Sequence, residues 1–289
     1  LTSEVCNLCT NHCQLTLAEV NGTTVAFGCS CGRDYNTKAH LKKADNGLDG
    51  VKKRRELKDK CFQRNPSLFN EITIGIPSAL HVYDDLEFWQ GFFTLLKINT
   101  ITSRGFKDGI TLGKKIAGAD FCMPVTTAHG HACWLTDKSD YVFAPVYMEE
   151  NTGSDIMQYC LYTQYVPALI KGIFPERTLM PLVRYLYSRR YVKKQLHAML
   201  KGITRRNIGF YEVSAAYDRM MTLKKVSEKQ IQKLGDTLIQ NRDDISIVLL
   251  GRPYAILPSS IICRITDMLA EQGIATVYQD MLKVEADTT

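Results

Sequence analysis

The stretch Ile72-Thr73-Ile74-Gly75-Ile76-Pro77-Ser78 indicates the fold class, because it is a short apolar strand that ends at a proline. Residues 85–98 follow it with large apolar side chains at helical spacing, which predicts a helix that buries one face. The next expected elements are a strand at 99–102, helices at 112–117 and 126–135, and a strand at 141–145. A chain that alternates strand, helix and strand in this way is typical of a parallel α/β sheet.

The same alternation recurs near the end of the chain, after a largely helical stretch. A run at 245–250 that is apolar except for Ser246 predicts a strand, and the turn Gly251-Arg252-Pro253-Tyr254 leads from it to an amphipathic helix at 260–272. A strand at 275–278 follows. We therefore expect a second α/β domain in this part of the chain.

These patterns divide the chain into five segments. They are a cysteine-rich module at 1–35, a linker with one helix at 36–70, a first α/β domain at 71–163, a helical segment at 164–240 and the start of a second α/β domain at 241–289. The chain opens on Leu1 without an initiator Met and closes soon after a strand. We therefore expect an excised, truncated piece of a longer polypeptide.

The amino-terminal module has a pattern of its own, with five cysteines in its first 31 positions. They are Cys6, Cys9, Cys13, Cys29 and Cys31. Between the two groups, residues 15–20 alternate apolar and polar, Asn21-Gly22 is typical of a tight turn, and residues 24–27 predict the returning strand. Such a β-hairpin brings both groups of cysteines together at its open end.

Cysteine thiolates are soft ligands, so this module favours zinc, copper(I) or an iron–sulfur cluster. Cys6, Cys9, Cys29 and Cys31 supply the four ligands of a tetrahedral zinc ion, with Cys13 as an alternative to one of them. The triplet of Cys6, Cys9 and Cys13 with one returning cysteine suits a [4Fe–4S] cluster equally well. The spacing leaves zinc and iron–sulfur both open.

The composition is that of a soluble globular protein, with 45% hydrophobic and 23% charged residues among 289. No apolar run reaches the roughly 18 residues that span a bilayer, and the chain does not begin with a secretory signal. We therefore expect a cytoplasmic protein without membrane contact. In that compartment its ten cysteines stay reduced, which favours metal binding over disulfides.

The net charge of +6 is concentrated in two basic runs, at 52–60 and at 177–206. Such runs attract anionic partners, including the phosphates of a nucleotide or of a CoA thioester. A helix face in contact with water is the more ordinary interpretation. The tyrosines of the second run are not spaced as a stacking platform for bases, so nucleic acid is not the expected partner.

Two further cysteines, Cys122 and Cys160, lie beyond the carboxyl ends of predicted strands, where open α/β sheets bind their ligands. Spacing alone favours the ordinary interpretation, a buried free cysteine, for each of them. Gly251 and Arg252 follow a predicted strand and lead to a helix. They place backbone N–H groups and a guanidinium where a phosphate or carboxylate could dock.

The remaining candidates are weaker. His129 and His131 are two positions apart on a predicted helix, so their side chains point in different directions and a shared metal ion is not expected. We expect a core or supporting role for them rather than a catalytic one. Cys133 and Cys263 fall within helical patterns and are expected in the core.

Taken in order, these motifs resemble one known family. They are the cysteine triplet, Ile74-Gly75-Ile76-Pro77, Phe88-Trp89, Phe92-Phe93, Cys122-Met123-Pro124, Ala128-His129-Gly130-His131, Tyr159-Cys160, Leu250-Gly251-Arg252-Pro253-Tyr254 and Asp280-Met281. The series is similar to the 2-hydroxyacyl-CoA dehydratase-related region of the CoA-substrate-specific enzyme activases of anaerobic bacteria, the DUF2229 region. The resemblance runs across nearly the whole chain.

The resemblance implies Rossmann-like α/β domains that hold an oxygen-sensitive iron–sulfur cluster, [4Fe–4S] or a larger double-cubane type, through three cysteines on strand-end loops. Cys122 and Cys160 match two of these positions, and the third is expected beyond Thr289. As a partner it implies an ATPase with its own iron–sulfur cluster, which drives a low-potential electron into the acceptor. A CoA thioester is the implied substrate class.

Two function hypotheses follow. In the first, the chain is the iron–sulfur electron-accepting domain of an ATP-driven, dehydratase- or reductase-type redox enzyme, since the phosphate loops of the ATPase are missing from its sequence. In the alternative, it is a non-catalytic binding module in which the amino-terminal cysteines hold zinc and a basic surface binds an anionic partner. Neither hypothesis identifies a catalytic residue.

Overall fold

The computed structural model describes ten segments of the chain. They are residues 1–7, 12–20, 22–28, 35–36, 47–62, 72–151, 156–184, 188–239, 245–258 and 265–283. The chain divides into two compact units, residues 1–46 and residues 47–289, and each is described by itself. No helix in the described segments is both long enough and apolar enough to cross a membrane.

The first unit holds a three-stranded antiparallel sheet in the order β1-β2-β3. Its strands are β1 (Thr2–Val5), β2 (Gln14–Val20) and β3 (Thr23–Phe27). Gly22 has a φ of 75° between β2 and β3, a left-handed backbone conformation that glycine adopts without strain. The sequence pattern had indicated β2 and β3, whereas β1 was missed.

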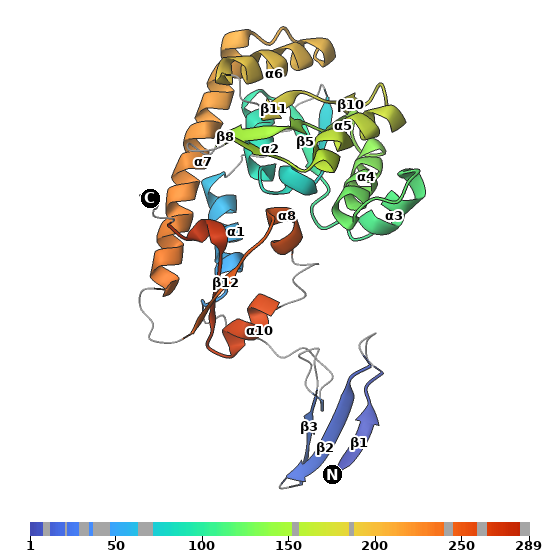
Figure 1. Ribbon diagram of the computed structural model, residues 1–289, viewed down its shortest axis with the longest axis vertical. Helices are drawn as coiled ribbons and strands as arrows, with labels where there is room; N and C mark the ends of the chain where they lie inside the picture. Colours follow the sequence, from blue (N-terminus) through green and yellow to red (C-terminus); the bar gives the residue numbers. More distant parts are fainter. Residues whose placement is uncertain are drawn as a thin grey trace. The chain divides into compact units, whose positions relative to one another are not determined.

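The second unit is mixed α/β and is organised around a four-stranded parallel sheet, which confirms the broad fold class (Figure 1). The sheet has the order β10-β6-β4-β5, and all three of its strand pairs are parallel. Its strands are β4 (Thr73–Ile76), β5 (Asn99–Thr102), β6 (Tyr141–Phe143) and β10 (Thr178–Leu179). The strands expected at 72–76, 99–102 and 141–145 are confirmed.

Helices cover both faces of this sheet, because neighbouring residues of each strand point to opposite sides. Ile74, Ile76 and Phe143 face one core, and Val142 faces the other. The helices of the first core are α2 (Leu86–Leu95), α6 (Arg189–Ile203) and α7 (Phe210–Ile239). Those of the second core are α4 (Met123–Thr136) and α5 (Leu161–Ile173), with η1 (Leu80–Tyr83) at its edge.

Helix α3 (Gly109–Ile116) packs on α4 at very short range because glycines stand at the contact. A Cβ on Gly130 would lie 1.9 Å from the Gly109 carbonyl oxygen, and one on Gly113 would lie 1.9 Å from that of Thr126. The glycine of the Ala128–His131 motif therefore serves helix packing. The helices expected at 85–98, 112–117 and 126–135 are confirmed, with shifted ends.

The segment expected to be helical, 164–240, also contains strands. Here β10 joins the main sheet, and β11 pairs in parallel with β7. Outside the main sheet the short strands are β7 (Val146–Tyr147), β8 (Glu149–Asn151), β9 (Ile156–Gln158) and β11 (Leu182–Arg184). Strands of two or three residues have no measurable periodicity, which explains why the sequence pattern missed them.

A second parallel pair lies further along the chain. It consists of β12 (Ser246–Leu249) and β13 (Ala275–Tyr278), joined through α8 (Pro253–Ile256) and α10 (Ile265–Glu271), with η2 (Gln279–Met281) after β13. This strand–helix–strand unit confirms the expected recurrence. The 30-residue helix α7 buries Val213 and Tyr217 in the core of the first sheet and Ile231 and Leu238 in that of the second (Figure 1).

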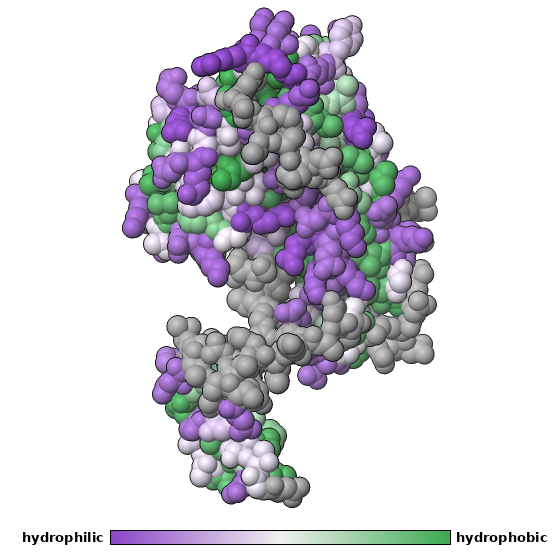
Figure 2. Space-filling model, turned by 180° about the vertical axis from the view of Figure 1, so that it is seen from behind, coloured by the Kyte–Doolittle hydropathy of each residue, from purple (hydrophilic) through white to green (hydrophobic). Residues whose placement is uncertain are grey.

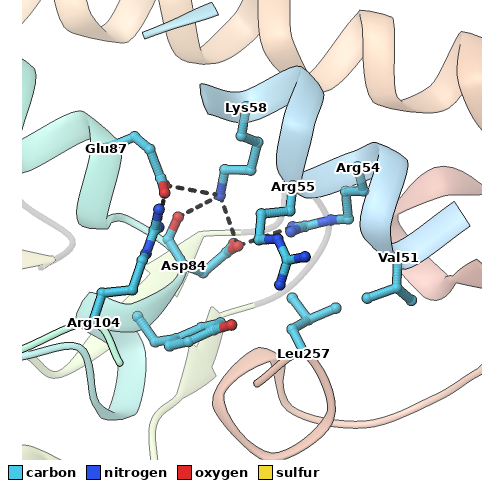
Figure 3. Close-up of a pocket in the computed structure, with 9 residues that line it drawn as sticks. Val51, Arg54, Arg55, Lys58, Asp84, Glu87, Arg104 and Leu257 are labelled. Carbon is cyan, nitrogen blue, oxygen red and sulfur yellow. Dashed lines mark hydrogen bonds and ion pairs between the residues drawn. The ribbon is translucent and has the colours of Figure 1, made fainter. Parts of the chain in front are cut away.

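Helix α1 (Gly50–Cys61) carries the first basic run, and the expectation of a solvated helix face holds for Arg55 and Lys60 but not for Arg54. Arg54 is only 5% exposed and its guanidinium contacts two carboxylates, Asp84 at 2.9 Å and Asp280 at 2.5 Å (Figure 3 shows the first of these contacts). Lys58 contacts Asp84 at 2.8 Å. Burial by itself would raise the pKa of Asp84, but Lys58 and Arg54 hold it well below its ordinary value.

We expect Arg54→Met to destabilise the protein by about 3 kcal/mol, because it leaves two carboxylates facing each other without their shared cation. Urea unfolding followed by circular dichroism measures the loss. Asp218→Asn is the matched control, since it breaks the contact of Lys193 with a carboxylate that is 53% exposed, and its cost should stay under about 1 kcal/mol. Equal losses in the two variants would contradict the structural role given to Arg54.

Candidate functional site

The order of strands in the main sheet locates a candidate site. From the central strand β4 the chain moves to β5 on one side and then returns to β6 on the other. The connections therefore diverge between β4 and β6, and parallel sheets bind ligands in the crevice outside the carboxyl ends of strands at such a point. Those ends lead here to Pro77 and Ala144.

Three helices begin near this edge, and the residue that caps each amino terminus is one singled out from the sequence. Cys122 precedes α4, Cys160 precedes α5 and Arg252 precedes α8. Helices α4 and α5 lead into strands β6 and β10, so their amino termini lie at the carboxyl edge of the sheet. The partial positive charge of each helix amino terminus is thus directed at a sulfur atom or lies beside a guanidinium.

Aromatic contacts bring the starts of α4 and α5 together. Phe121, directly before Cys122, lies edge-on to Tyr162, two residues after Cys160, with ring centroids 6.0 Å apart. Phe121 also stacks on His129 at 5.6 Å. Cys122 is exposed and Cys160 half-buried, so both thiols are accessible, unlike the buried cysteines that spacing alone had favoured.

The electrostatics of the site favour the thiolate form of Cys160. Burial by itself would raise the pKa of this thiol, but the backbone N–H groups of Thr163 and Tyr162 and the guanidinium of Arg252 outweigh it and hold the pKa below its ordinary value. Arg252 also donates to the hydroxyl of Tyr254 at 3.0 Å.

A group of rings around His81 adjoins Cys160 and Arg252. The His81 ring lies 4.1 Å from that of Tyr159 and 5.2 Å from that of Tyr254, measured between centroids, and Tyr147 is 5.7 Å away. Tyr147 is held in place by two hydrogen bonds. Its hydroxyl accepts from Trp89 Nε1 at 3.0 Å and donates to Asp85 at 3.2 Å.

Beneath these rings is a hollow of about 380 Å³, counting the space open to solvent. Pro77 and Ala144 line it at the strand ends, and α4 and α5 form its walls with Ala128 and Val166. His81, Tyr147 and Thr163 are the polar residues in its lining. An apolar pocket with a few polar groups at a strand-end crevice is the ordinary form of a small-molecule site.

Gly251 is placed differently from the expectation of a free phosphate-binding turn. Its N–H donates to Gln279 Oε1 at 3.0 Å and its carbonyl accepts from the Tyr278 hydroxyl at 2.5 Å. Both backbone groups are therefore engaged within the protein. Its φ of 146° and the closeness of Ile256 explain why glycine stands there, and Arg252 is the residue of this turn that reaches the site.

The two histidines of α4 have separate environments. His131 is buried, and its Nδ1 lies 2.6 Å from Ser103 Oγ, which also accepts from the Ser78 N–H at 2.8 Å. Burial lowers the pKa of His131 to about 4, so the ring that shares a hydrogen bond with the Ser103 hydroxyl is neutral at neutral pH. The His131 ring thereby ties α4 to the ends of β4 and β5. His129 Nδ1 lies 2.8 Å from the carbonyl oxygen of Val125.

The amino-terminal cysteines are only partly described. Cys6 and Cys13 are buried opposite each other, with the Cys6 N–H donating to the Cys13 carbonyl at 2.9 Å. Cys9, Cys29, Cys31 and Cys263 lie outside the described residues. In the described segments no group of three or more Cys, His, Asp or Glu is arranged to hold a metal ion, and Cys133 is half-buried on α4. The four-thiolate site stays a prediction.

Several residues of the site were not anticipated. His81 and Tyr147 were missed, and Tyr159 and Tyr254 had been noted only as members of sequence motifs. His81 and Tyr147 follow β4 and β6 by a few residues, so their position just beyond strand ends was the available indication. Which of them share one cluster depends on tertiary contacts that local patterns do not contain.

Comparison with known proteins adds one finding. A family model described as CoA enzyme activase uncharacterised domain (DUF2229) matches residues 73–282. No curated protein and no solved structure matches the chain. The matched range includes β4 to η2, and with them Cys122, Cys160 and Arg252.

We expect Arg252→Gln to move the alkylation of Cys160 by iodoacetamide to higher pH, because loss of the guanidinium raises the pKa of the thiol. Mass spectrometry of timed reactions between pH 6 and pH 9 identifies the modified residue. Arg219→Gln, an exposed arginine on α7, is the control. An unchanged profile in Arg252→Gln would show that the guanidinium does not act on the sulfur.

His131 makes stability depend on pH in a defined window. Above the unfolded value of 6.5 it is neutral in both states, whereas between 6.5 and about 4 only the unfolded chain takes up its proton. The free energy of unfolding should therefore fall by up to about 3 kcal/mol as the pH drops through this range. Urea unfolding at several pH values measures it. His131→Asn, which keeps an acceptor for Ser103, should flatten this slope, and an identical slope would contradict the assignment.

Proposed function

Because the chain belongs to the family described as CoA enzyme activase uncharacterised domain, we propose that it is the iron–sulfur, electron-accepting part of an ATP-driven activase system related to the 2-hydroxyacyl-CoA dehydratases. The observation that carries the proposal is the placement of Cys122 and Cys160. Both cap helices at the carboxyl edge of the main sheet, and their neighbours Phe121 and Tyr162 are in contact. The proposal that the two α/β halves are Rossmann-like is supported by the same feature, a candidate site at the carboxyl edge of a parallel sheet.

The donor set fits such a cluster in its chemistry. Iron–sulfur clusters are bound by thiolates, and the Arg252 guanidinium and the N–H groups at the start of α5 already favour the thiolate of Cys160. Two thiolates are fewer than the four that a [4Fe–4S] cluster requires. The other ligands would come from outside the described residues. A cluster held there would supply the low-potential electron acceptor.

The residues of the chain have distinct tasks in this proposal. Cys122 and Cys160 would bind the iron–sulfur cluster. Arg252 and the helix amino termini would offset negative charge at the sulfur atoms and so favour the reduced state of that cluster. The hollow beside His81 receives the substrate, proposed to be a CoA thioester. Its apolar walls exclude water from the acyl portion of such a substrate.

An ATPase partner with its own cluster is part of the proposal. Four exposed apolar side chains surround the two cysteines, namely Met123 at 61%, Leu161 at 66%, Tyr162 at 58% and Tyr165 at 63%. Large apolar side chains exposed together are typical of protein contacts. A donor that docks there brings its electron close to the cysteines.

The alternative function keeps one observation in its favour. On α6 the residues Arg189, Arg190, Lys194 and Lys201 are exposed, and Figure 2 shows hydrophilic side chains gathered over this end of the second unit. A zinc-containing module that binds an anionic partner through this face would be colourless, with about one zinc at the amino-terminal cysteines, and its binding would weaken with salt. The iron–sulfur proposal predicts iron and sulfide instead.

We expect Cys122→Ser and Cys160→Ser each to lower the iron and sulfide bound after anaerobic reconstitution, because each removes a thiolate ligand. Metal analysis with absorption near 400 nm and electron paramagnetic resonance measures the change. Cys61→Ser is the matched control, since this half-buried thiol lies on α1 and donates to Gln230 at 3.0 Å. Iron contents equal to that of Cys61→Ser would refute the proposed site and leave the amino-terminal cysteines as the binding region.

A further inference from the structure

A second hollow lies beside the Arg54 ion network, and cations predominate in its lining (Figure 3). Its volume is also about 380 Å³, counting the space open to solvent. The cations are Arg54, Arg55, Lys58 and Arg104, against the two carboxylates Asp84 and Glu87. Val51, Leu257 and the ring of Tyr83 complete the lining. Within the lining itself, cations outnumber carboxylates by four to two.

The carboxylates in this lining are already neutralised. Asp84 contacts both Arg54 and Lys58, and Glu87 contacts Arg104 and, at 3.9 Å, Lys58. Asp280 and Asp59, which do not line the hollow, contact Arg54 and Arg104 from outside it. The four carboxylates thus hold Arg54, Lys58 and Arg104 in position, and each carboxylate is itself paired with a cation.

Arg55 is the exception among the four cations. Its side chain extends into the space between Asp84 and Leu257 in Figure 3, and it contacts no carboxylate in the described segments. Tyr83 adds a neutral hydroxyl, because burial raises the pKa of its phenol and keeps it protonated at neutral pH. An exposed guanidinium beside held cations and a hydroxyl donor is arranged to receive an anion.

We propose that this hollow binds the phosphate group of a small molecule. Arg55 donates to the phosphate through its planar fork, and Lys58 and Arg104 add charge from positions fixed by Asp84 and Glu87. Val51 and Leu257 form an apolar wall for the adjoining part of a phosphomonoester. None of the described residues that line the hollow is a cysteine, so the proposal does not depend on the proposed iron–sulfur site at Cys122 and Cys160.

The test is calorimetric titration of the iron-free chain with inorganic phosphate at constant ionic strength set by chloride. Wild type should bind saturably, and Arg55→Gln should weaken binding by at least about tenfold, since it removes hydrogen bonds to a charged group. Arg55→Lys, which keeps the charge without the fork, should be intermediate. Arg219→Gln, on the exposed face of α7, should bind as wild type does.

Coenzyme A and dephospho-coenzyme A distinguish the sources of the phosphate. Tighter binding of coenzyme A, lost in Arg55→Gln, identifies its 3′-phosphate as the ligand group. Equal binding of both, with inorganic phosphate still dependent on Arg55, identifies free phosphate or another phosphomonoester. Absence of saturable phosphate binding by wild type, or equal binding by wild type and Arg55→Gln, would overturn the proposal.

Discussion

One buried guanidinium holds together three parts of the second unit that are distant in sequence. Arg54 on α1 contacts Asp84, which follows η1, and Asp280 in η2, so it links the first α/β region to the end of the second. A lone charge in a protein interior is costly, which requires both carboxylates to stay in place. The first two of these segments, α1 and the residues around Asp84, also line the cationic hollow. Helix α1 therefore has two roles. Arg54 faces inward and stabilises the fold, whereas Arg55 faces the solvent and belongs to the proposed phosphate site.

The candidate site depends on a second constraint, the direction of its helices. Helices α4 and α5 lead into the parallel strands β6 and β10, and each runs antiparallel to the strand that it precedes. Their amino termini therefore lie at the edge of the sheet where the strands end. A cysteine at such a position receives the partial positive charge of the helix. Cys160 also receives the charge of Arg252. These features stabilise the thiolate form of Cys160 in the absence of a bound ligand.

The main strands and helices could be predicted from sequence because their periodicity is local. Strands β4 and β13 lie in short, mainly apolar runs, and α2 carries four large aromatic residues, all of them buried. The burial of Arg54 could not be predicted. Its partners lie 30 and 226 positions away, and a basic run of this kind is ordinarily solvated. The strand-end location of Cys122 and Cys160 was foreseen, whereas the approach of Arg252 depends on how α8 packs against η1.

The contact between Cys160 and Arg252 has a consequence of its own, because the two residues are connected to different sheets. Cys160 starts a helix that leads into the four-stranded sheet, and Arg252 follows the first strand of the two-stranded one. Any movement that opened the space between the sheets would withdraw the guanidinium and make the sulfur a stronger base. The proton affinity of the Cys160 thiol therefore depends on the separation of the four-stranded sheet and the β12–β13 pair.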